Sequence, residues 1–255
     1  MTGEQAKSPD TAPHSLWLVP ADSPGVPRRT LTRGQVVSEA LEIVSAVGAQ
    51  SLTMRGLADR LGVVPGALYR HVRSKEQLQD LVLDAVLGEI DMRPDGSLDW
   101  AGQVTVLAGR LRAVLENHPG IAALLKSRDL ISPHSLALAE ALLAPLHHAG
   151  LPARQAVLAY RLIYDYTVGF ALGDPTSPAE QRLRDTATRR ELHAFLRSLP
   201  ADRFPAVAAY GTHAWADDRD QRFDSGLDTL FRGLQADLGP ADDASGDLND
   251  GASER

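Results

Sequence analysis

Apolar residues between positions 53 and 75 follow two short helical repeats that are separated by a glycine turn. Two sets at helical spacing lie on either side of Gly62: Leu57, Ala58 and Leu61 before it, and Ala67, Leu68 and Val72 after it. Because the period restarts on a new axis, the two helices must cross rather than continue. Two short crossing helices followed by a Tyr-Arg-His-Val-Arg-Ser-Lys run at 69–75 are typical of a helix-turn-helix whose second helix enters the major groove of DNA.

A preceding helix is predicted from both capping residues and apolar periodicity. Thr32 is placed to cap this first helix with its hydroxyl while the Gln35 side chain reaches back, and Gly48 ends it. Its inward side chains are expected to be Val36, Val37, Ala40, Leu41 and Val44. The first helix would therefore supply an apolar face for the two crossing helices.

The next three helices are bounded by similar signals. Thr53 caps the second helix, Gly62 closes it, and the third helix spans about 64–72. Ser74 and Gln77 form another capping-box pattern that opens a fourth helix. One side of this fourth helix is apolar: Leu78, Leu81, Val82, Ala85, Val86 and Ile90.

The helical pattern continues beyond a Pro/Gly break at 92–99, which we interpret as a domain boundary. The predicted helices of this second region are 99–117, 133–148, 151–173, 178–199 and 220–238. No window shows the alternation of a strand. The fold class is therefore predicted to be all-α, with an N-terminal three-helix helix-turn-helix domain and a larger C-terminal helical bundle.

Both ends of the chain have compositions that do not favour a packed fold. Residues 1–30 contain five prolines and no sustained period, and residues 240–255 contain five acidic residues and one arginine. We therefore predict a disordered arm at 1–30, a helix-turn-helix domain at 31–92 that includes the connecting fourth helix, a second domain at 93–239, and a disordered acidic tail at 240–255.

Charge is distributed unevenly between these regions. The whole chain has a net charge of −7, but residues 28–75 contain eight Lys and Arg against three Asp and Glu, a net charge of +5 that leaves −12 for the rest. A basic module joined to an acidic body is typical of a DNA-binding domain with a separate regulatory domain, since phosphate contacts supply much of the affinity for DNA.

Composition narrows the other function classes. The chain has 255 residues, 44% of them hydrophobic and none of them cysteine, which fits a cytoplasmic protein that folds without disulfides. No apolar run approaches the roughly 18 residues that span a bilayer, so no membrane role is expected. We find no Gly-rich phosphate loop, and His147 and His148 are neighbours that point about 100° apart on a helix rather than a metal-binding pair. We therefore expect no enzyme activity, cofactor or metal.

The segment LTMRGLADRLGVVPGALYRHVRSKEQL at 52–78 resembles the N-terminal signature of the tetracycline-repressor (TetR) family of bacterial transcriptional regulators. The Trp100 helix, the YRLIYDYTVGFAL helix and the closing GLDTLFRGLQADL helix are similar to the C-terminal regulatory domain of the Tet repressor itself. This resemblance implies a homodimer that binds a palindromic operator through two recognition helices and releases it when a small-molecule effector binds to residues 93–239. The expected function is therefore a ligand-responsive repressor, with an activator of the same architecture as an alternative.

The resemblance also implies roles for individual residues on the DNA side. Tyr69 and Lys75 match family positions that contact the operator backbone, with a helix-packing tyrosine and a solvated lysine as the alternatives. His71 has a similar role or forms a hydrogen bond within the domain. Arg28, Arg29 and Arg33 either reach DNA from the arm or form a solvated basic run.

Base reading is assigned to Arg55 and to the start of the third helix, which we expect to be exposed: Val64, Pro65, Gly66, Ala67 and Arg70. An arginine can bind guanine through two hydrogen bonds, whereas Pro and Ala offer only small apolar contacts to thymine. Phosphate contact is the alternative for Arg55 and Arg70. The matching positions of the Tet repressor are more polar, so its operator is not expected to transfer to this chain.

Family geometry places the effector pocket among polar and aromatic groups of the second region: His118, His134, His147, Tyr160, Arg161, Tyr164, Asp165 and Tyr166. Ordinary helix-interface contacts are the alternative for each of them. At 121–131 an apolar residue replaces the metal-coordinating histidine of the Tet repressor, so a magnesium–tetracycline ligand is not expected. The identity of the effector is not predicted.

Dimerisation is expected through the helices at 151–173 and 220–238, which carry more apolar surface than one small bundle needs and which the family pairs across its two-fold axis. A monomer that buries both helices internally is the alternative.

The alternative to the whole functional prediction is a helix-turn-helix that binds only proteins. Salt dependence of duplex binding distinguishes the two, because it is steep for a DNA-binding protein and flat for a protein-interaction module.

Overall fold

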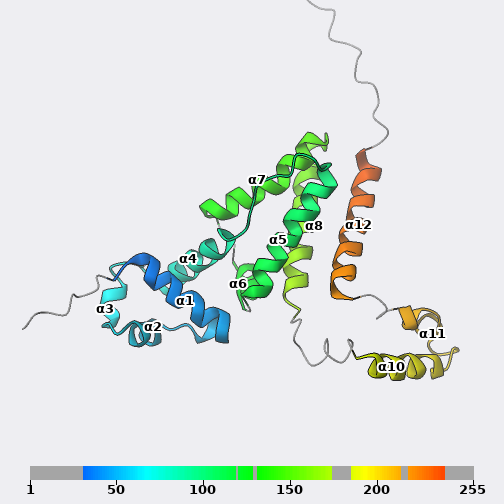
Figure 1. Ribbon diagram of the computed structural model, residues 1–255, viewed down its shortest axis with the longest axis horizontal. Helices are drawn as coiled ribbons and strands as arrows, with labels where there is room; N and C mark the ends of the chain where they lie inside the picture. Colours follow the sequence, from blue (N-terminus) through cyan, green and yellow to red (C-terminus); the bar gives the residue numbers. More distant parts are fainter. Residues whose placement is uncertain (1–30, 119, 129–130, 174–184, 214–217, 239–255) are drawn as a thin grey trace, which may run out of the picture.

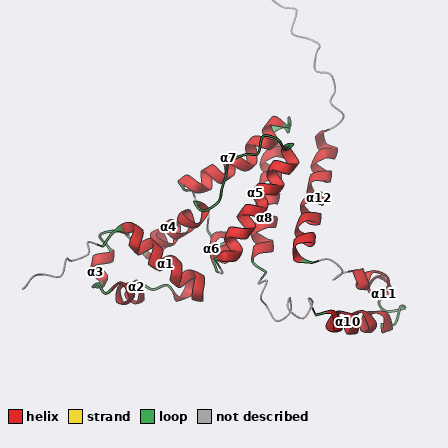
Figure 2. Ribbon diagram, viewed as in Figure 1, coloured by secondary structure: helices red, strands yellow, loops and turns green. Residues whose placement is uncertain are grey.

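The described part of the chain consists of helices and their connections (Figure 1). The computed structural model describes residues 31–118, 120–128, 131–173, 185–213 and 218–238, and no strand occurs within these ranges (Figure 2). The N-terminal elements are α1 (Arg33–Val47), η1 (Ala49–Ser51), α2 (Met54–Leu61), α3 (Pro65–Leu68) and α4 (Lys75–Leu87). The C-terminal elements are α5 (Trp100–Asn117), α6 (Ile121–Lys126), α7 (Pro133–His148), α8 (Ala153–Ala171), α10 (Thr186–Ser198), α11 (Pro205–Tyr210), η2 (Gly211–His213) and α12 (Arg219–Leu238). The all-α prediction is confirmed.

Local side-chain chemistry sets the ends of the first two helices. The Thr32 hydroxyl accepts a hydrogen bond from the backbone N–H of Gln35 at 3.2 Å, and the backbone N–H of Thr32 donates to the Gln35 side chain at 2.9 Å. Gly48 ends α1 with φ 83°, and Gly62 ends α2 with φ 65°. Residues with a side chain rarely adopt these positive φ values, so the two glycines allow the chain to change direction there.

Two predicted features of the N-terminal domain are wrong in detail. The third helix ends at Leu68 rather than near Val72, and the intervening residues form a turn held by hydrogen bonds to the Leu68 carbonyl. The Ser74 hydroxyl caps α4 by accepting from the backbone of Gln77, but the Gln77 side chain accepts from Arg73 at 2.6 Å instead of returning to Ser74. The capping box at α4 is therefore only half formed.

In the C-terminal region the helix predicted at 178–199 begins later, at Thr186, where the Asp185 side chain caps it. Residues 174–184 lie outside the described residues, as do the predicted arm at 1–30 and the tail at 240–255. The short helices α6 and α11 were not predicted, because six residues are too few to show a helical period.

One continuous apolar core joins the two groups of helices. Leu57 and Leu68 are fully buried among α1–α4, and Leu111 and Phe223 are buried among α5, α8 and α12. Helix α4 contacts α1 as well as α5, α6 and α7, so it belongs to both groups. Helices α10 and α11 lie apart from this bundle and contact chiefly each other and η2 (Figure 1).

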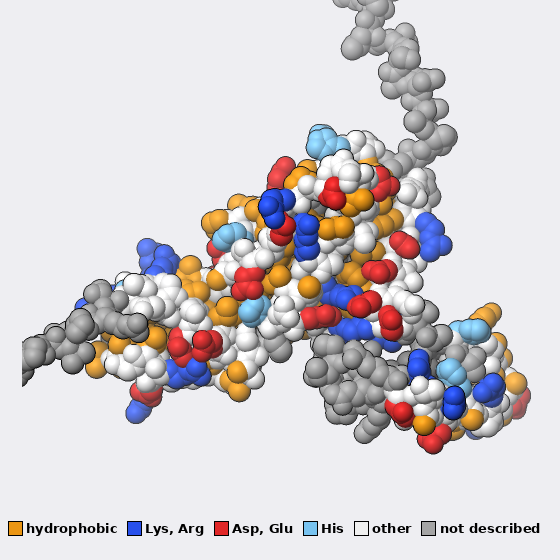
Figure 3. Space-filling view, in the orientation of Figure 1, with side chains coloured by type: hydrophobic (Ala, Val, Ile, Leu, Met, Phe, Trp, Pro, Cys, Tyr) orange, Lys and Arg blue, Asp and Glu red, His pale blue; other side chains and the backbone are white. Residues whose placement is uncertain are grey.

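The start of α12 is fastened to α5 and α8 by a cluster of arginines and carboxylates, visible as mixed blue and red beside α12 (Figure 3). Arg219 pairs with Glu116 at 3.1 Å and donates to the carbonyl of Phe170 at 2.7 Å. Arg112 pairs with Asp220, and its guanidinium lies 4.6 Å from the centre of the Phe223 ring.

No helix of the described residues is both long and apolar enough to cross a membrane.

We predict that Leu57→Ala lowers the free energy of unfolding by about 2–5 kcal/mol, because it leaves a cavity at a fully buried position. Urea denaturation followed by circular dichroism measures the change. Val47→Ala is the matched control, since Val47 is 63% exposed, and it should shift the free energy of unfolding by no more than about 0.5 kcal/mol. A small effect of Leu57→Ala would contradict the packing described here.

Candidate nucleic-acid interface and ligand cavity

The connection between α2 and α3 is a tight turn built on Gly62. The backbone N–H of Val63 donates to the Ala58 carbonyl at 3.0 Å, and Val64 provides the last extended residue before α3. Pro65 occupies the first position of α3, where its fixed φ suits a helix and its missing N–H is not needed. The turn therefore sets α3 across α2 with its start directed outward.

Most of the predicted base-reading residues are exposed and lie in α3 or directly beside it. Val64 is 70% exposed, and Pro65, Gly66 and Arg70 are also exposed. Ala67 differs from the prediction, because it is only 8% exposed. Ala67 lies on the inner side of α3 beside Leu68. Its methyl group therefore contributes to packing and is not available for the expected contact to thymine.

The residues predicted to contact phosphates surround this exposed side. Tyr69 is 53% exposed at the end of α3, and His71 and Lys75 are half-buried. Lys75 is the first residue of α4, where the free N–H groups of the first turn add to the attraction for an anion. Tyr69 is thus exposed over about half of its surface at the position that is predicted to contact phosphate.

Two arginines of the same domain have different surroundings. Arg55 is exposed in the first turn of α2. Arg60, at the other end of α2, pairs with Glu39 and also with Glu42, at 3.1 Å, on α1. Arg60 therefore joins two helices, whereas Arg55 remains open for an external ligand.

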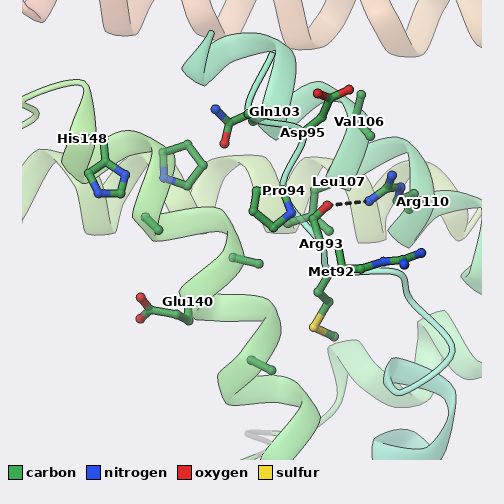
Figure 4. Close-up of a pocket in the computed structure, with 15 residues that line it drawn as sticks. Met92, Arg93, Pro94, Asp95, Gln103, Val106, Leu107, Arg110, Glu140 and His148 are labelled. Atoms are coloured by element: carbon green, nitrogen blue, oxygen red, sulfur yellow. Dashed lines mark hydrogen bonds between the residues drawn. The ribbon is translucent and has the colours of Figure 1, made fainter. Parts of the chain in front are cut away.

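A cavity of about 520 Å³ lies between α5, α7 and the connection from α4 to α5 (Figure 4). The connection contributes residues 92–96, α5 contributes Gln103, Val106, Leu107 and Arg110, and α7 contributes Ala137, Glu140, Ala141, Ala144, Pro145 and His148. The side chains of Met92, Pro94 and Leu107 lie between the two helices in Figure 4. The walls are thus mainly apolar, with polar groups at a few positions, as in sites that bind organic ligands.

Arg110 holds the connection that closes one side of the cavity. Its guanidinium donates to the carbonyl of Asp91 at 2.7 Å and to that of Arg93 at 3.0 Å. The Arg93 side chain pairs with the Asp91 carboxylate at 2.8 Å. Hydrogen bonds from the side chain and the backbone of Arg93 keep the pKa of Asp91 below its ordinary value. The cavity wall is therefore ordered by side chains of α5 and of the connection itself.

The predicted effector residues do not line this cavity, although His148, the neighbour of His147, does. His118 lies 3.2 Å from the Ser45 hydroxyl and 2.9 Å from the Glu89 carboxylate, and His134 pairs with Asp84. Both histidines thus join the C-terminal helices to α1 and α4. His147 is exposed at the end of α7.

The remaining predicted effector residues lie along α8. The rings of Tyr160 and Tyr164 are 6.1 Å apart, and burial raises the pKa of both hydroxyls, so these stay protonated. Arg161 and Asp165 are exposed on the same helix. The Tyr166 hydroxyl donates to backbone carbonyls at the start of α12, so it has a packing role. The structure therefore does not gather these residues with the three histidines around one cavity.

Sequence reasoning missed the cavity because most of its wall looks like core or linker. The alanines of α7 have no property that separates a cavity wall from a helix contact, and residues 92–96 were interpreted as a break between domains. The available signal was the pair Gln103 and Arg110, two polar residues that lie two turns apart on the same face of α5.

In the described ranges no group of three or more His, Asp or Glu side chains is placed to hold a metal ion.

Comparison with known proteins agrees with this arrangement. Residues 36–81 match the family described as "Bacterial regulatory proteins, tetR family", and residues 93–238 match "Tetracyclin repressor-like, C-terminal domain". The chain belongs to the tetR family. The expectation of a ligand-responsive DNA-binding transcriptional repressor is thereby confirmed at the level of the family.

Similar members of the tetR family cover most of the chain. A protein of Saccharopolyspora erythraea named "HTH-type transcriptional regulator" is 34% identical over 229 residues, which are 89% of this chain and 94% of that protein. The "HTH-type transcriptional repressor DrrR1" of Streptomyces coeruleorubidus is 30% identical and covers 82% of this chain, with 79% of its own length matched. The structure of the Streptomyces coelicolor protein ActR in complex with actinorhodin superposes with a TM-score of 0.71 at 31% identity, over 82% of this chain and 99% of ActR.

We predict that Lys75→Ala and Tyr69→Ala each weaken binding to every tested duplex by roughly 100-fold, because the expected dimer loses two charge-assisted contacts to phosphate, one from each protomer, of about 1.5 kcal/mol each. Lys75→Ala should also reduce the slope of log affinity against log salt by about two, one for the Lys75 of each protomer. Fluorescence anisotropy with duplexes selected from random sequences measures both quantities. Lys126→Ala, which removes an exposed charge from α6, is the control and should leave affinity unchanged. Unchanged affinity in both variants would exclude this docking face.

Proposed function

We propose that residues 31–92 bind a palindromic DNA operator through the exposed side of α3 and that residues 93–239 sense a small molecule in the cavity between α5 and α7. The observation that supports this most directly is the orientation of α3. Leu68 is fully buried and α3 packs on α2, whereas Val64 and Arg70 on either side of it are exposed. A short helix held in this way can enter a major groove about 12 Å wide while its inner residues stay buried in the domain.

Within this interface we assign two kinds of contact. Arg70 and Arg55 are proposed to bind guanine edges, and the apolar residues at the start of α3 are proposed to contact thymine methyl groups. Tyr69, His71 and Lys75 are proposed to contact phosphates and so fix the position of the helix in the groove.

We propose a homodimer formed by the segments 151–173 and 220–238. The outer side of α8 supports this, because Val157, Leu158 and Leu162 are each about half exposed and lie on neighbouring turns. Arg161 and Asp165 lie beside these apolar residues and offer charge pairing across a two-fold axis. Burying this apolar surface against a second copy would stabilise the dimer by roughly 25 cal/mol per Å² removed from water.

We infer that the effector is an organic molecule that is largely apolar and carries at least one polar group. The mainly apolar walls of the cavity favour the first property, and Gln103 and His148 favour the second. Since the relatives named above are regulators rather than enzymes, we propose a binding role and not a catalytic one. The proposed site of action is the cytoplasm, because duplex DNA is the partner.

Selection of bound fragments from the genome of the source organism tests the proposed operator binding. We expect the effector-free dimer to enrich palindromic sites and to lose affinity steeply as salt increases, because bound phosphates release counterions. Binding that is independent of salt, or no preference for any duplex at low ionic strength, would contradict the proposal and favour a protein-interaction module.

We predict that Arg70→Ala changes which bases are preferred at one position of each half-site, in addition to weakening binding by about 1–3 kcal/mol for each half-site. Repeating the selection with the variant measures this change. Arg190→Ala, which removes an exposed arginine from α10, is the control for the loss of charge. If Arg70→Ala weakens all sequences equally, Arg70 is a phosphate contact.

We predict that Leu162→Glu converts the dimer to a folded monomer and weakens operator binding by more than ten-fold, roughly the loss expected when one of two half-sites is no longer bound together with the other. Light scattering measures the mass, and circular dichroism checks that the helices are retained. Val47→Glu places the same charge on an exposed residue of α1 and should remain dimeric. A Leu162→Glu variant that stays dimeric would rule out the outer side of α8 as the interface.

A further inference from the structure

Helix α7 contacts both the DNA-binding domain and the ligand cavity. His134, in its first turn, contacts α4, and Ala137, Ala141 and Ala144 face the cavity. At about 1.5 Å per residue, His134 and Ala141 are separated by about 10 Å along the helix axis. A molecule that displaces this wall of the cavity therefore acts on a helix whose first turn already contacts α4.

The polar contact between α7 and α4 is centred on one carboxylate, that of Asp84. It accepts a hydrogen bond from the backbone N–H of His134 at 2.9 Å and another from the His134 ring nitrogen Nδ1 at 3.0 Å. Burial alone would raise the pKa of Asp84, but hydrogen bonds from Ser132 and from both groups of His134 outweigh this effect and lower it. Asp84 therefore stays ionised and holds the start of α7 from two sides.

The fit between His134 and α4 is close. A methyl group added at Gly88, the residue that ends α4, would lie 3.0 Å from Cε1 and Nε2 of the His134 ring. The ring therefore rests directly on the backbone at the end of α4. If α7 moves, either α4 moves with it or the hydrogen bonds to Asp84 break.

The chain weakens α7 at the level of the cavity. Pro145 has no N–H to donate to the carbonyl of Ala141, four residues earlier, and both residues line the cavity. Loss of this helical hydrogen bond lowers the cost of bending at that point. Residues 133–141, which include the contact to Asp84, are therefore able to tilt relative to the end of the helix.

The opposite wall of the cavity, α5, is more firmly held. Glu116 near its end pairs with Arg219 of α12, and Arg112 pairs with Asp220 while packing on the Phe223 ring. Helix α5 also packs extensively against α8. A ligand that enlarges the cavity should therefore displace α7 rather than α5.

We propose that residues 133–141 of α7 transmit effector binding to the DNA-binding domain and that Asp84 is the positioning residue that converts movement of α7 into movement of α4. This inference rests on the proposed function, since it requires that the cavity binds the effector and that α3 binds DNA. Helix α4 begins with Lys75 and packs against α1, so a tilt of α4 changes the position of the DNA-contacting surface.

Because the chain has no cysteine, a single cysteine introduced in the cavity wall is the only thiol that a reagent can modify, and a label attached there fills the cavity. The probe is N-phenylmaleimide attached to an Ala144→Cys variant, and the duplex is one recovered by selection with the same variant before labelling. The measured quantity is the ratio of the duplex affinities before and after labelling. Wild-type protein treated with the reagent controls for effects other than cysteine modification.

The ratio is compared in three backgrounds: Asp84 intact, Asp84→Asn, and Asp80→Asn. Asp80 lies one turn earlier on α4 and pairs with Arg128 at 2.6 Å, so its substitution removes a parallel contact that does not involve α7. We expect labelling to weaken binding about ten-fold or more with Asp84 intact and in Asp80→Asn, within the usual range of coupling between sites. In Asp84→Asn we expect a change of less than about three-fold.

The possible failures are distinguishable. Equal weakening in all three backgrounds would overturn the role of Asp84 and leave the cavity as the effector site. No weakening with Asp84 intact would overturn the effector site, and the role of Asp84 with it. Circular dichroism shows whether each variant is folded.

A second pair of variants keeps the test independent of Asp84→Asn. His134→Ala removes the ring and its hydrogen bond, whereas His134→Asn keeps a side-chain N–H donor near the position of Nδ1. We expect the labelling response to fall in His134→Ala and to be retained in His134→Asn. Full responses in both variants would contradict the proposed route.

Discussion

Helix α4 has to bury apolar side chains against two groups of helices at the same time, and the arrangement of the whole chain follows from this requirement. Its buried apolar residues are Leu78, Val82, Leu83, Val86 and Leu87, which contact α1 on one side and α5, α6 and α7 on the other. Separating the two groups would expose this surface to water at a cost of roughly 25 cal/mol per Å². The DNA-binding and sensing regions therefore stay in contact through α4.

Polar contacts at the edge of α4 have a different role from the buried ones. Asp80, Asp84 and Glu89 are partly exposed and pair with Arg128, His134 and His118, respectively. Ion pairs that are open to solvent contribute little to stability, typically less than about 1 kcal/mol each. Each pair nevertheless joins α4 or its C-terminal end to a residue of the C-terminal region at a defined distance. Apolar burial keeps the domains together, and these polar contacts select how they are oriented.

Features encoded within a few neighbouring residues could be predicted from the sequence. Thr32 and Gln35 cap α1 as expected, and Gly62 ends α2, because both depend on backbone groups within one helical turn. The exposed side of α3 was also predicted apart from Ala67, whose burial depends on how closely α3 packs against the rest of the domain. The bonding of Gln77 to Arg73 shows that even a local capping pattern has competing partners.

Contacts between distant segments could not be predicted in the same way. His134 was assigned to an effector pocket because it lies in an apolar helix, but its partner Asp84 is 50 residues away and belongs to the other domain. The cavity combines a linker with faces of two helices whose alanines carry no chemical signal. The domain pattern and the family could be recognised from sequence, whereas the placement of each polar group required the packed structure.

Two positions at the outward side of α3 make few contacts with the rest of the protein. A methyl group added at Gly66 would have no neighbour within 4 Å, and Val64 is mostly exposed. Substitutions there leave the core unchanged, so the base contacts proposed for these residues can vary without a loss of stability. In regulators built this way, duplicated copies can diverge to control different genes while they keep the same fold and the same sensor.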